Sequence, residues 1–194
     1  MQFYELRDMF KRSVNARRDM TENSRIYDGK IISVRVDKVQ INGRQTIREV
    51  VEHNGSAAIL PLIGNMIIME KQYRYAIQKE LYEIPAGTLE KGESPEECAA
   101  RELVEETGYR AGKLEPLGKC YMTPGYCTEM IHFFLATDLK EVKAHEMDKD
   151  ERLTVVNISI DDAVKMILNG EIEDAKTVCA ILTYLTSRKV KFDA

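Results

Sequence analysis

The chain has 194 residues, of which 44% are hydrophobic and 31% are charged, and its formal net charge at pH 7 is −4. This length allows one substantial core, or one core with a small appendage. No apolar stretch approaches the ~20 residues that a membrane-spanning helix needs, so no membrane partner is expected. The negative charge argues against non-specific binding to nucleic acid. The four cysteines form no CxxC pair, which favours reduced thiols and a cytoplasmic location.

The N-terminal part of the chain is predicted to hold one helix and then two short strands. Residues 3–20 place their apolar side chains near one stripe, as an amphipathic helix does. After Thr21–Asn23, apolar and polar residues alternate from Ile32 to Asp37, which indicates a strand. The Asn42-Gly43 pair then predicts a tight hairpin. A β-rich segment this small is not expected to be stable by itself.

The remaining residues indicate a larger α+β domain. Two apolar runs flank Gly64-Asn65, a pattern typical of a hairpin with deeply buried strands. Later periodicities predict strands over 117–121, 131–136 and 153–160, and helices over 160–168 and 174–187. Strands mix with few helices and without regular βαβ alternation, so we expect a mixed α+β sandwich. The expected division is an N-terminal helix and β-rich segment, 1–54, and a main domain, 55–194.

An acidic segment at residues 87–109 has the signals of one short helix. Ser94 suits the N-cap, Pro95 suits the first helical position, and Glu97 completes a capping box. Gly108 stands where a helix that ends in a left-handed residue needs glycine. The helix is therefore expected to begin at Pro95 and to stop before Gly108.

Three carboxylates are expected to crowd one side of this helix. Glu102, Glu105 and Glu106 stand at i, i+3 and i+4, so their Cβ atoms would lie roughly 5–6 Å apart. Ionised carboxylates at this spacing repel one another, and a hard divalent cation with oxygen ligands removes that penalty. Mg²⁺ is the expected ion, with Mn²⁺ as a substitute. The alternative is a solvated acidic face for which Arg101 is the local counterion.

The spacing of the whole segment resembles a known motif. Residues 87–109 read GTLEKGESPEECAARELVEETGY. This is similar to the Nudix box, G-x5-E-x7-R-E-U-x-E-E-x-G-U, in which U is a bulky apolar residue. All fixed positions of the box match, and Leu103 and Tyr109 suit the bulky positions. The chain is therefore identified as a member of the Nudix hydrolase family.

The resemblance implies the fold and the chemistry of that family. The fold would be an α/β/α sandwich, preceded here by a small N-terminal antiparallel β domain, and the reaction would be hydrolysis of a nucleoside diphosphate linked to another moiety. The metal ligands that it implies are the Ala86 carbonyl and the carboxylates of Glu102, Glu105 and Glu106. The other roles that it implies are catalysis by Glu105 and by Arg101, which orients a carboxylate, and support of the loop by Gly87, Glu93 and Gly108.

Three stretches outside the box resemble the ADP-ribose pyrophosphatase branch of the family, namely 71–93, 121–136 and 170–184. With the box, the similarity covers most of residues 25–185. It implies Mg²⁺-dependent cleavage of ADP-ribose to AMP and ribose 5-phosphate. The alternatives are a pyrophosphatase for another nucleoside diphosphate sugar, such as GDP-mannose, and a non-catalytic ADP-ribose sensor, which the intact carboxylates oppose.

Four residues outside the box are predicted to bind substrate. The guanidinium of Arg74 would grip two phosphate oxygens, unless it is a surface arginine at a strand end. Arg48 is a second arginine of this kind. Pro124 would lie near the terminal ribose, or would form a simple turn with Gly125. Glu129 would contact substrate, or would cap the following strand.

A carboxylate that positions or activates the attacking water is also needed. The polar loop 145–155 lies where similar pyrophosphatases carry a catalytic glutamate. Glu151 is the favoured residue, with Asp148 and Asp150 as rivals. The structural alternative is a solvated acidic loop.

The N-terminal segment is expected to serve assembly. In the similar pyrophosphatases, an N-terminal sheet domain is exchanged across a two-fold dimer and completes the partner's substrate site. A homodimer is therefore expected. The role of the helix over 3–20 is left open.

Overall fold

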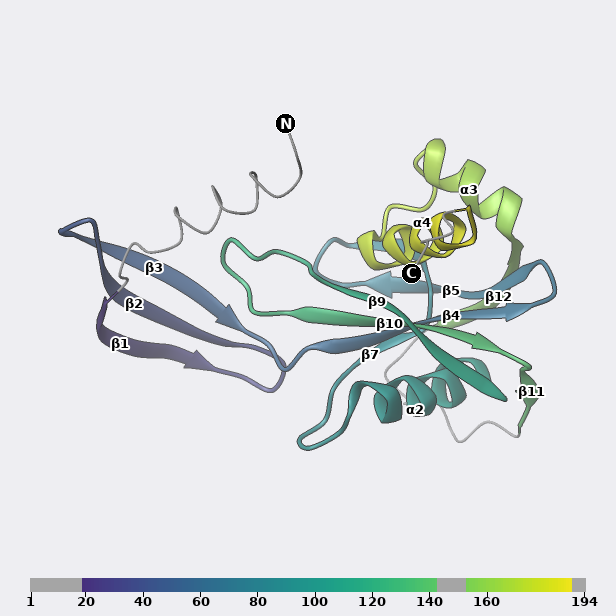
Figure 1. Ribbon diagram of the computed structural model, residues 1–194, viewed down its shortest axis with the longest axis horizontal. Coiled ribbons are helices and arrows are strands. Elements are labelled where there is room, and N and C mark those ends of the chain that lie inside the picture. Colours follow the sequence, from purple (N-terminus) through teal and green to yellow (C-terminus); the bar gives the residue numbers. More distant parts are fainter. Residues whose placement is uncertain (1–18, 143–152, 190–194) are drawn as a thin grey trace. The chain divides into compact units, whose positions relative to one another are not determined.

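The computed structural model of the chain describes residues 19–142 and 153–189 (Figure 1). The described residues separate into two compact units. The first contains strands β1–β3 and the loop Thr123–Thr128, and the second contains the other elements from Asn54 onward. The division into 1–54 and 55–194 stays a prediction.

The first unit is a three-stranded antiparallel sheet in the order β1-β2-β3. Its strands are β1 (Asp19–Asp28), β2 (Ser33–Ile41) and β3 (Arg44–Glu52). The hairpin predicted at Asn42-Gly43 is confirmed, since these two residues join β2 to β3. Both have positive φ, 50° and 76°, which matches the twist of a two-residue hairpin.

Strand β1 departs from the sequence prediction. The helix expected over 3–20 is wrong at its end, because Asp19 and Met20 already belong to β1, and the rest of that helix lies outside the described residues. The sequence of β1, DMTENSRIYD, is mostly polar and has no clear period-2 pattern. It is a strand because it pairs along its length with β2, with two register shifts. Arg25 adds an ion pair to Glu52 of β3 at 2.7 Å.

The second unit is built on a mixed sheet in the order β12-β5-β4-β10-β9, with β6 beside β5 and β7 beside β4. Its strands are β4 (Ser56–Ile63), β5 (Met66–Arg74), β6 (Lys79–Glu83), β7 (Ala86–Thr88), β9 (Lys113–Tyr121), β10 (Met130–Thr137) and β12 (Leu153–Ser159). Strands β4 and β10 are parallel, and the other pairs are antiparallel. The predicted hairpin at Gly64-Asn65 is confirmed between β4 and β5. A separate small pair joins β8 (Tyr109–Arg110) to β11 (Lys140–Glu141).

Helices cover both faces of this sheet (Figure 1). They are α2 (Pro95–Thr107) on one face, and α3 (Ile160–Leu168) and α4 (Ala175–Lys189) on the other. Side chains of β4 alternate between the two layers: Ala57 and Ile59 pack with α2, whereas Ala58 and Leu60 belong to the core that includes α4. A strand buried on both faces reads as a continuous apolar run. The expected α/β/α sandwich with a small antiparallel sheet is confirmed. In the part of the chain that the structure describes, no helix is long and apolar enough to cross a membrane.

Candidate active site

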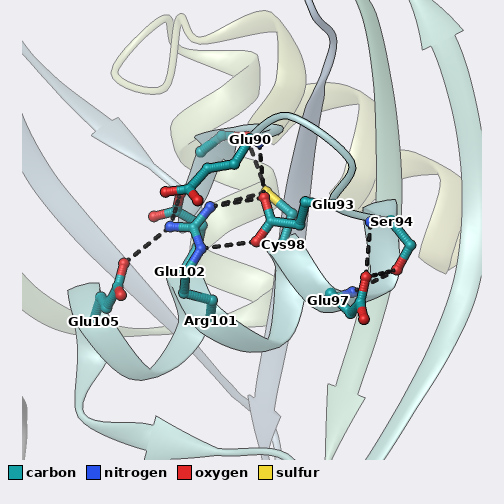
Figure 2. Close-up of polar contacts among 9 residues, drawn as sticks. Glu90, Glu93, Ser94, Glu97, Cys98, Arg101, Glu102 and Glu105 are labelled. Carbon is teal, nitrogen blue, oxygen red and sulfur yellow. Dashed lines mark hydrogen bonds and ion pairs between the residues drawn. The ribbon is translucent and has the colours of Figure 1, made fainter.

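The acidic segment folds as the loop and helix that its signals predict (Figure 2). Ser94 is the N-cap of α2: its Oγ accepts a hydrogen bond from Glu97 N at 3.2 Å, and Glu97 Oε2 accepts one from Ser94 N at 2.9 Å. Pro95 opens the helix, and Gly108 follows its last residue in the left-handed conformation, with φ 73°. The predicted capping box and glycine stop are confirmed, and they fix the register of the glutamates on α2.

The guanidinium of Arg101 joins three glutamates of the acidic segment (Figure 2). Arg101 donates to both oxygens of Glu93, from Nε at 2.9 Å and from Nη2 at 3.1 Å. Its Nη1 donates to Glu102 Oε1 at 2.7 Å and to Glu105 Oε2 at 3.0 Å. The hydrogen bond from Arg101 outweighs burial and lowers the pKa of Glu93 to about 2. Glu93 is therefore ionised at neutral pH and ties the loop before α2 to the helix.

Two carboxylates of α2 reach the short strand β7. Glu106 is buried, and its Oε2 accepts a hydrogen bond from the backbone N of Ala86 at 2.9 Å. The carboxylate of Glu102 lies over the Cα of Gly87, so closely that a Cβ there would overlap it. Glycine is needed at this position because a side chain would exclude the carboxylate. The two glutamates thus converge on Ala86 and Gly87.

The groups at this junction fit a hard divalent cation. The carboxylates of Glu102 and Glu106 and the backbone of β7 offer oxygen donors, which Mg²⁺ prefers. The carboxylate of Glu105 accepts a hydrogen bond from Arg101, as that of Glu102 also does. Within residues 19–142 and 153–189, no three His, Cys, Asp or Glu side chains are arranged as a metal-binding group. The residues that could hold an ion are Glu102 and Glu106, whose carboxylates meet at β7, and Glu105, which stands on the same helix.

A pocket of about 180 Å³ opens beside β7 in the same unit. The residues that line it include Ser56, Arg74, Ala86, Gly87, Glu129 and Lys176. Glu129 Oε1 accepts a hydrogen bond from Ser56 Oγ at 3.1 Å, which holds this carboxylate at the wall. Because Ala86 and Gly87 belong both to the pocket and to the carboxylate junction, the two features are adjacent.

The cations of the pocket are held by a buried carboxylate. Glu83 is 1% exposed and accepts hydrogen bonds from Arg74 Nε at 2.7 Å and from Arg74 Nη2 at 2.6 Å. Lys176 Nζ donates to the same Oε2 of Glu83. Burial alone would raise the pKa of Glu83, but the Arg74 hydrogen bonds and the charge of Lys176 outweigh it and lower that pKa. Glu83 is thus an ionised anchor for both cations.

Known proteins provide an independent comparison. Residues 53–181, which are more than half of the chain, match the NUDIX domain. The chain belongs to the Nudix family. It is 43% identical over 159 residues to the ADP-ribose pyrophosphatase of Bacillus subtilis (strain 168), covering 80% of this chain and 86% of that protein. It is 39% identical over 163 residues to the methanol dehydrogenase activator of Bacillus methanolicus, covering 82% and 88%.

Two further proteins resemble the chain, one in sequence and one in fold. The GDP-mannose pyrophosphatase of Escherichia coli (strain SMS-3-5 / SECEC) is 37% identical over 148 residues, which are 71% of this chain and 76% of that protein. A solved structure of an ADP compounds hydrolase has a TM-score of 0.80, covers 89% of this chain and 95% of its own, and is 22% identical in sequence. That structure shows the same fold, so the predicted Nudix fold is confirmed.

The substrate-binding residues predicted from the sequence fall in two different units. Arg74 and Glu129 line the pocket of the second unit beside the box carboxylates. Arg48 belongs to the first unit, where its Nη1 donates to Thr46 Oγ1 at 3.2 Å and to the Ile47 carbonyl at 2.8 Å. Pro124 is exposed on the loop of that unit.

The structure does not test the predicted catalytic base. Glu151 and its rivals Asp148 and Asp150 lie outside the described residues, so this choice stays a prediction.

Two residues of the pocket network were not predicted from the sequence. Glu83 falls within a run that resembles the family but has no predicted role, and the pattern around Lys176 predicts only a helix. A signal for Lys176 does exist, because a cation in the first turn of a helix opposes the helix dipole. No local pattern pairs Lys176 with Glu83, which lies 93 positions earlier.

Proposed function

We propose that the chain hydrolyses the diphosphate bond of ADP-ribose, adding one water across the P–O–P bridge to give AMP and ribose 5-phosphate. The observation that carries this proposal is the junction at Ala86 and Gly87, with carboxylates on one side and a pocket containing Arg74 and Lys176 on the other. A diphosphate requires both cationic donors and a carboxylate-bound metal. The similarity to the ADP-ribose pyrophosphatase of Bacillus subtilis supports the choice of substrate.

The proposed cofactor is Mg²⁺, with Mn²⁺ as a substitute. Its proposed ligands are the Ala86 carbonyl and the carboxylates of Glu102, Glu105 and Glu106. A bound ion of this kind neutralises charge on the diphosphate and lowers the pKa of a coordinated water. Glu105 is 47% exposed, so its ion pair with Arg101 contributes little and is easily exchanged for a metal contact.

The protein groups proposed to bind and position the reactants surround the pocket. Arg74 uses Nε and Nη2 on Glu83, which leaves Nη1 for a phosphate oxygen. The Glu129 carboxylate is held by Ser56 and offers an acceptor for a ribose hydroxyl. Arg48 and Pro124 are proposed as further substrate contacts. Glu151 is proposed to position the attacking water.

A second substrate class is favoured by a specific similarity. The chain is 37% identical to GDP-mannose pyrophosphatases, whose named substrate carries the same diphosphate. The residues described as lining the pocket beside β7 are charged, hydroxyl-bearing, small or aliphatic, and they include no aromatic ring that could stack on a base. Its described residues therefore suit the diphosphate and leave the choice of base to measurement.

A non-catalytic ADP-ribose sensor is less favoured because all box carboxylates are present.

We further propose that the chain works in the cytoplasm as a homodimer through its N-terminal segment. The first unit is a three-stranded sheet, and several of its large apolar side chains are exposed. These are Ile26, Tyr27, Ile31 and Ile47. Several exposed large apolar side chains on so small a sheet support an interface with a second copy.

Product analysis tests the proposed function. The purified chain would be mixed with Mg²⁺ and with ADP-ribose, ADP-glucose, GDP-mannose, NADH or a diadenosine polyphosphate, and the products would be separated by chromatography. We expect AMP to appear fastest from ADP-ribose. Faster cleavage of another compound would keep the Nudix chemistry and overturn the substrate. Binding of ADP-ribose without cleavage of any compound would favour the sensor.

A further inference from the structure

Helix α4 begins with a cation where helix electrostatics disfavour one. Lys176 is the second residue of α4, in the turn that carries the positive end of the helix dipole. Its side chain is 11% exposed, so it has lost most of its hydration. An apolar residue would avoid both costs. Local conflicts of this kind are expected mainly at functional sites.

Two carboxylates fix the position of the Lys176 ammonium group. Its Nζ donates to Glu83 Oε2 and lies 3.1 Å from Asp174 Oδ2. Asp174 in turn accepts a hydrogen bond from Thr177 N at 3.0 Å, which ties it to the first turn of α4. An ammonium group has three donor hydrogens, so at least one remains after these two contacts. Because Lys176 lines the pocket beside β7, that hydrogen is available to a ligand there.

Glu83 brings a second cation to the same place. Arg74 Nη2 and Lys176 Nζ both donate to Oε2 of this carboxylate, and both side chains line the pocket. Two cations that share one oxygen repel each other. A further anion in the pocket would relieve this repulsion, and a phosphate oxygen matches the donors of both side chains.

We propose that Lys176 binds the diphosphate of the substrate, donating to one of its anionic oxygens beside Arg74, and that Glu83 positions both cations. This proposal rests on the proposed function, because it takes the ligand to be a nucleoside diphosphate sugar. The pocket lies next to Ala86 and Gly87, so an oxygen bound there is close to the carboxylates of α2.

Binding without metal tests this role directly. The ligand is the α,β-methylene analogue of ADP-ribose, whose bridge is not hydrolysed, and affinity is measured by calorimetry in EDTA. Lys176→Met keeps the length of the side chain and removes its charge, so we expect the dissociation constant to rise by roughly tenfold or more. Lys176→Arg should retain most of the affinity. Lys165→Met is the control, because it removes an exposed lysine from an ion pair with Asp162 and should leave affinity unchanged.

A purely structural role for Lys176 predicts a different pattern. If Lys176 only neutralised Glu83, removing both charges in a Lys176→Met/Glu83→Gln double variant would restore the affinity of Glu83→Gln alone. We expect the double variant to remain roughly tenfold weaker than Glu83→Gln. Restored affinity, or an unchanged dissociation constant in Lys176→Met, would overturn the proposal.

A measurement on the wild type guards against variants that fail to fold. The side-chain ¹⁵N resonance of Lys176, identified by comparison with Lys176→Arg, should shift when the analogue is added. An unchanged resonance at saturation contradicts the contact.

Failure of the proposed substrate would give a separate result. The wild type would then bind GDP-mannose or another nucleoside diphosphate sugar in preference, and Lys176→Met would weaken the binding of that ligand by the same factor. If the wild type binds no such compound, both proposals fail.

Discussion

The carboxylate of Glu102 occupies the space that a side chain at Gly87 would fill. The atoms nearest to a Cβ there are Oε1, Cδ and Cγ of Glu102, the last at 2.7 Å. Because these atoms form the mobile end of a long side chain, Gly87→Ala should displace the carboxylate rather than the backbone. We predict that this variant lowers kcat by roughly tenfold or more, while its Tm falls by only a few degrees.

A double variant shows whether the loss acts through Glu102. If Gly87→Ala only displaces that carboxylate, combining it with Glu102→Gln should be no slower than Glu102→Gln alone. Steady-state kcat for the two single variants and the double variant makes the comparison. Losses that multiply would show that Gly87 has a separate role.

Of the three proposed metal-binding glutamates of α2, Glu106 is the buried one, and its loss should separate activity from folding. Its Oε2 accepts from Ala86 N at 2.9 Å, a hydrogen bond that the amide oxygen of Gln can also accept. Glu106→Gln should therefore keep the fold while removing a charge from the proposed metal site, and we expect kcat to fall by two or more orders of magnitude. Glu96→Gln, an exposed substitution in the first turn of the same helix, is the matched control. A wild-type rate in Glu106→Gln would remove Glu106 from the mechanism.

The ion pair of Arg101 with Glu93 should give stability a pH dependence of known sign. The Arg101 hydrogen bond lowers the pKa of Glu93 from 4.5 to about 2. A carboxylate whose pKa is lower in the folded state stabilises the fold above its unfolded pKa, and this contribution is lost as the pH falls through the folded pKa. Arg101→Met should therefore be less stable than the wild type at pH 7, and the difference should shrink as the pH falls from 4.5 to about 2. Urea unfolding across this range measures it, and a constant difference would contradict the pairing.

The sequence specifies the acidic helix more fully than any other part of the molecule. Ser94, Pro95 and Gly108 each act through local backbone geometry, so the start and the stop of α2 follow from neighbouring residues alone. The hairpin at Asn42-Gly43 is predictable for the same reason, because positive φ angles favour those residue types. Continuous apolar runs likewise predicted the deeply buried strands β4 and β5.

Features that depend on distant partners could not be predicted in this way. Strand β1 is mostly polar, and its extended form results from pairing with β2 rather than from its own residues. The approach of Glu102 to Gly87 and the sharing of Glu83 by two cations join residues that are far apart in sequence. Single-sequence patterns carry no register for such contacts, so helix periodicity placed the carboxylates of α2 on one face, and only the resemblance to the Nudix box implied that they lie beside Ala86.

The N-cap of α2 should contribute stability that can be measured separately from catalysis. Ser94 Oγ accepts from Glu97 N at 3.2 Å, and Ala at this position leaves that donor without the side-chain acceptor. Ser94→Ala should lower the free energy of unfolding by about 1 kcal/mol, whereas Ser94→Asp should lose much less. Urea unfolding of the three proteins gives the comparison. Equal losses in the Ala and Asp variants would show that the cap does not stabilise α2.

The N-terminal sheet should determine the oligomeric state. Ile31 and Ile47 are 66% and 58% exposed, and Ile26 is also among the exposed large apolar side chains of this unit. Because a dimer interface would bury these side chains, we predict a mass of two chains in light scattering at micromolar concentration. Ile47→Lys places a charge among these apolar side chains and should shift the mass toward one chain.

Leu168→Lys is the control. Leu168 is 82% exposed on α3 of the other unit, so this substitution should leave the mass unchanged. A wild-type mass of one chain would contradict the homodimer, and an unchanged mass in Ile47→Lys would place the interface elsewhere.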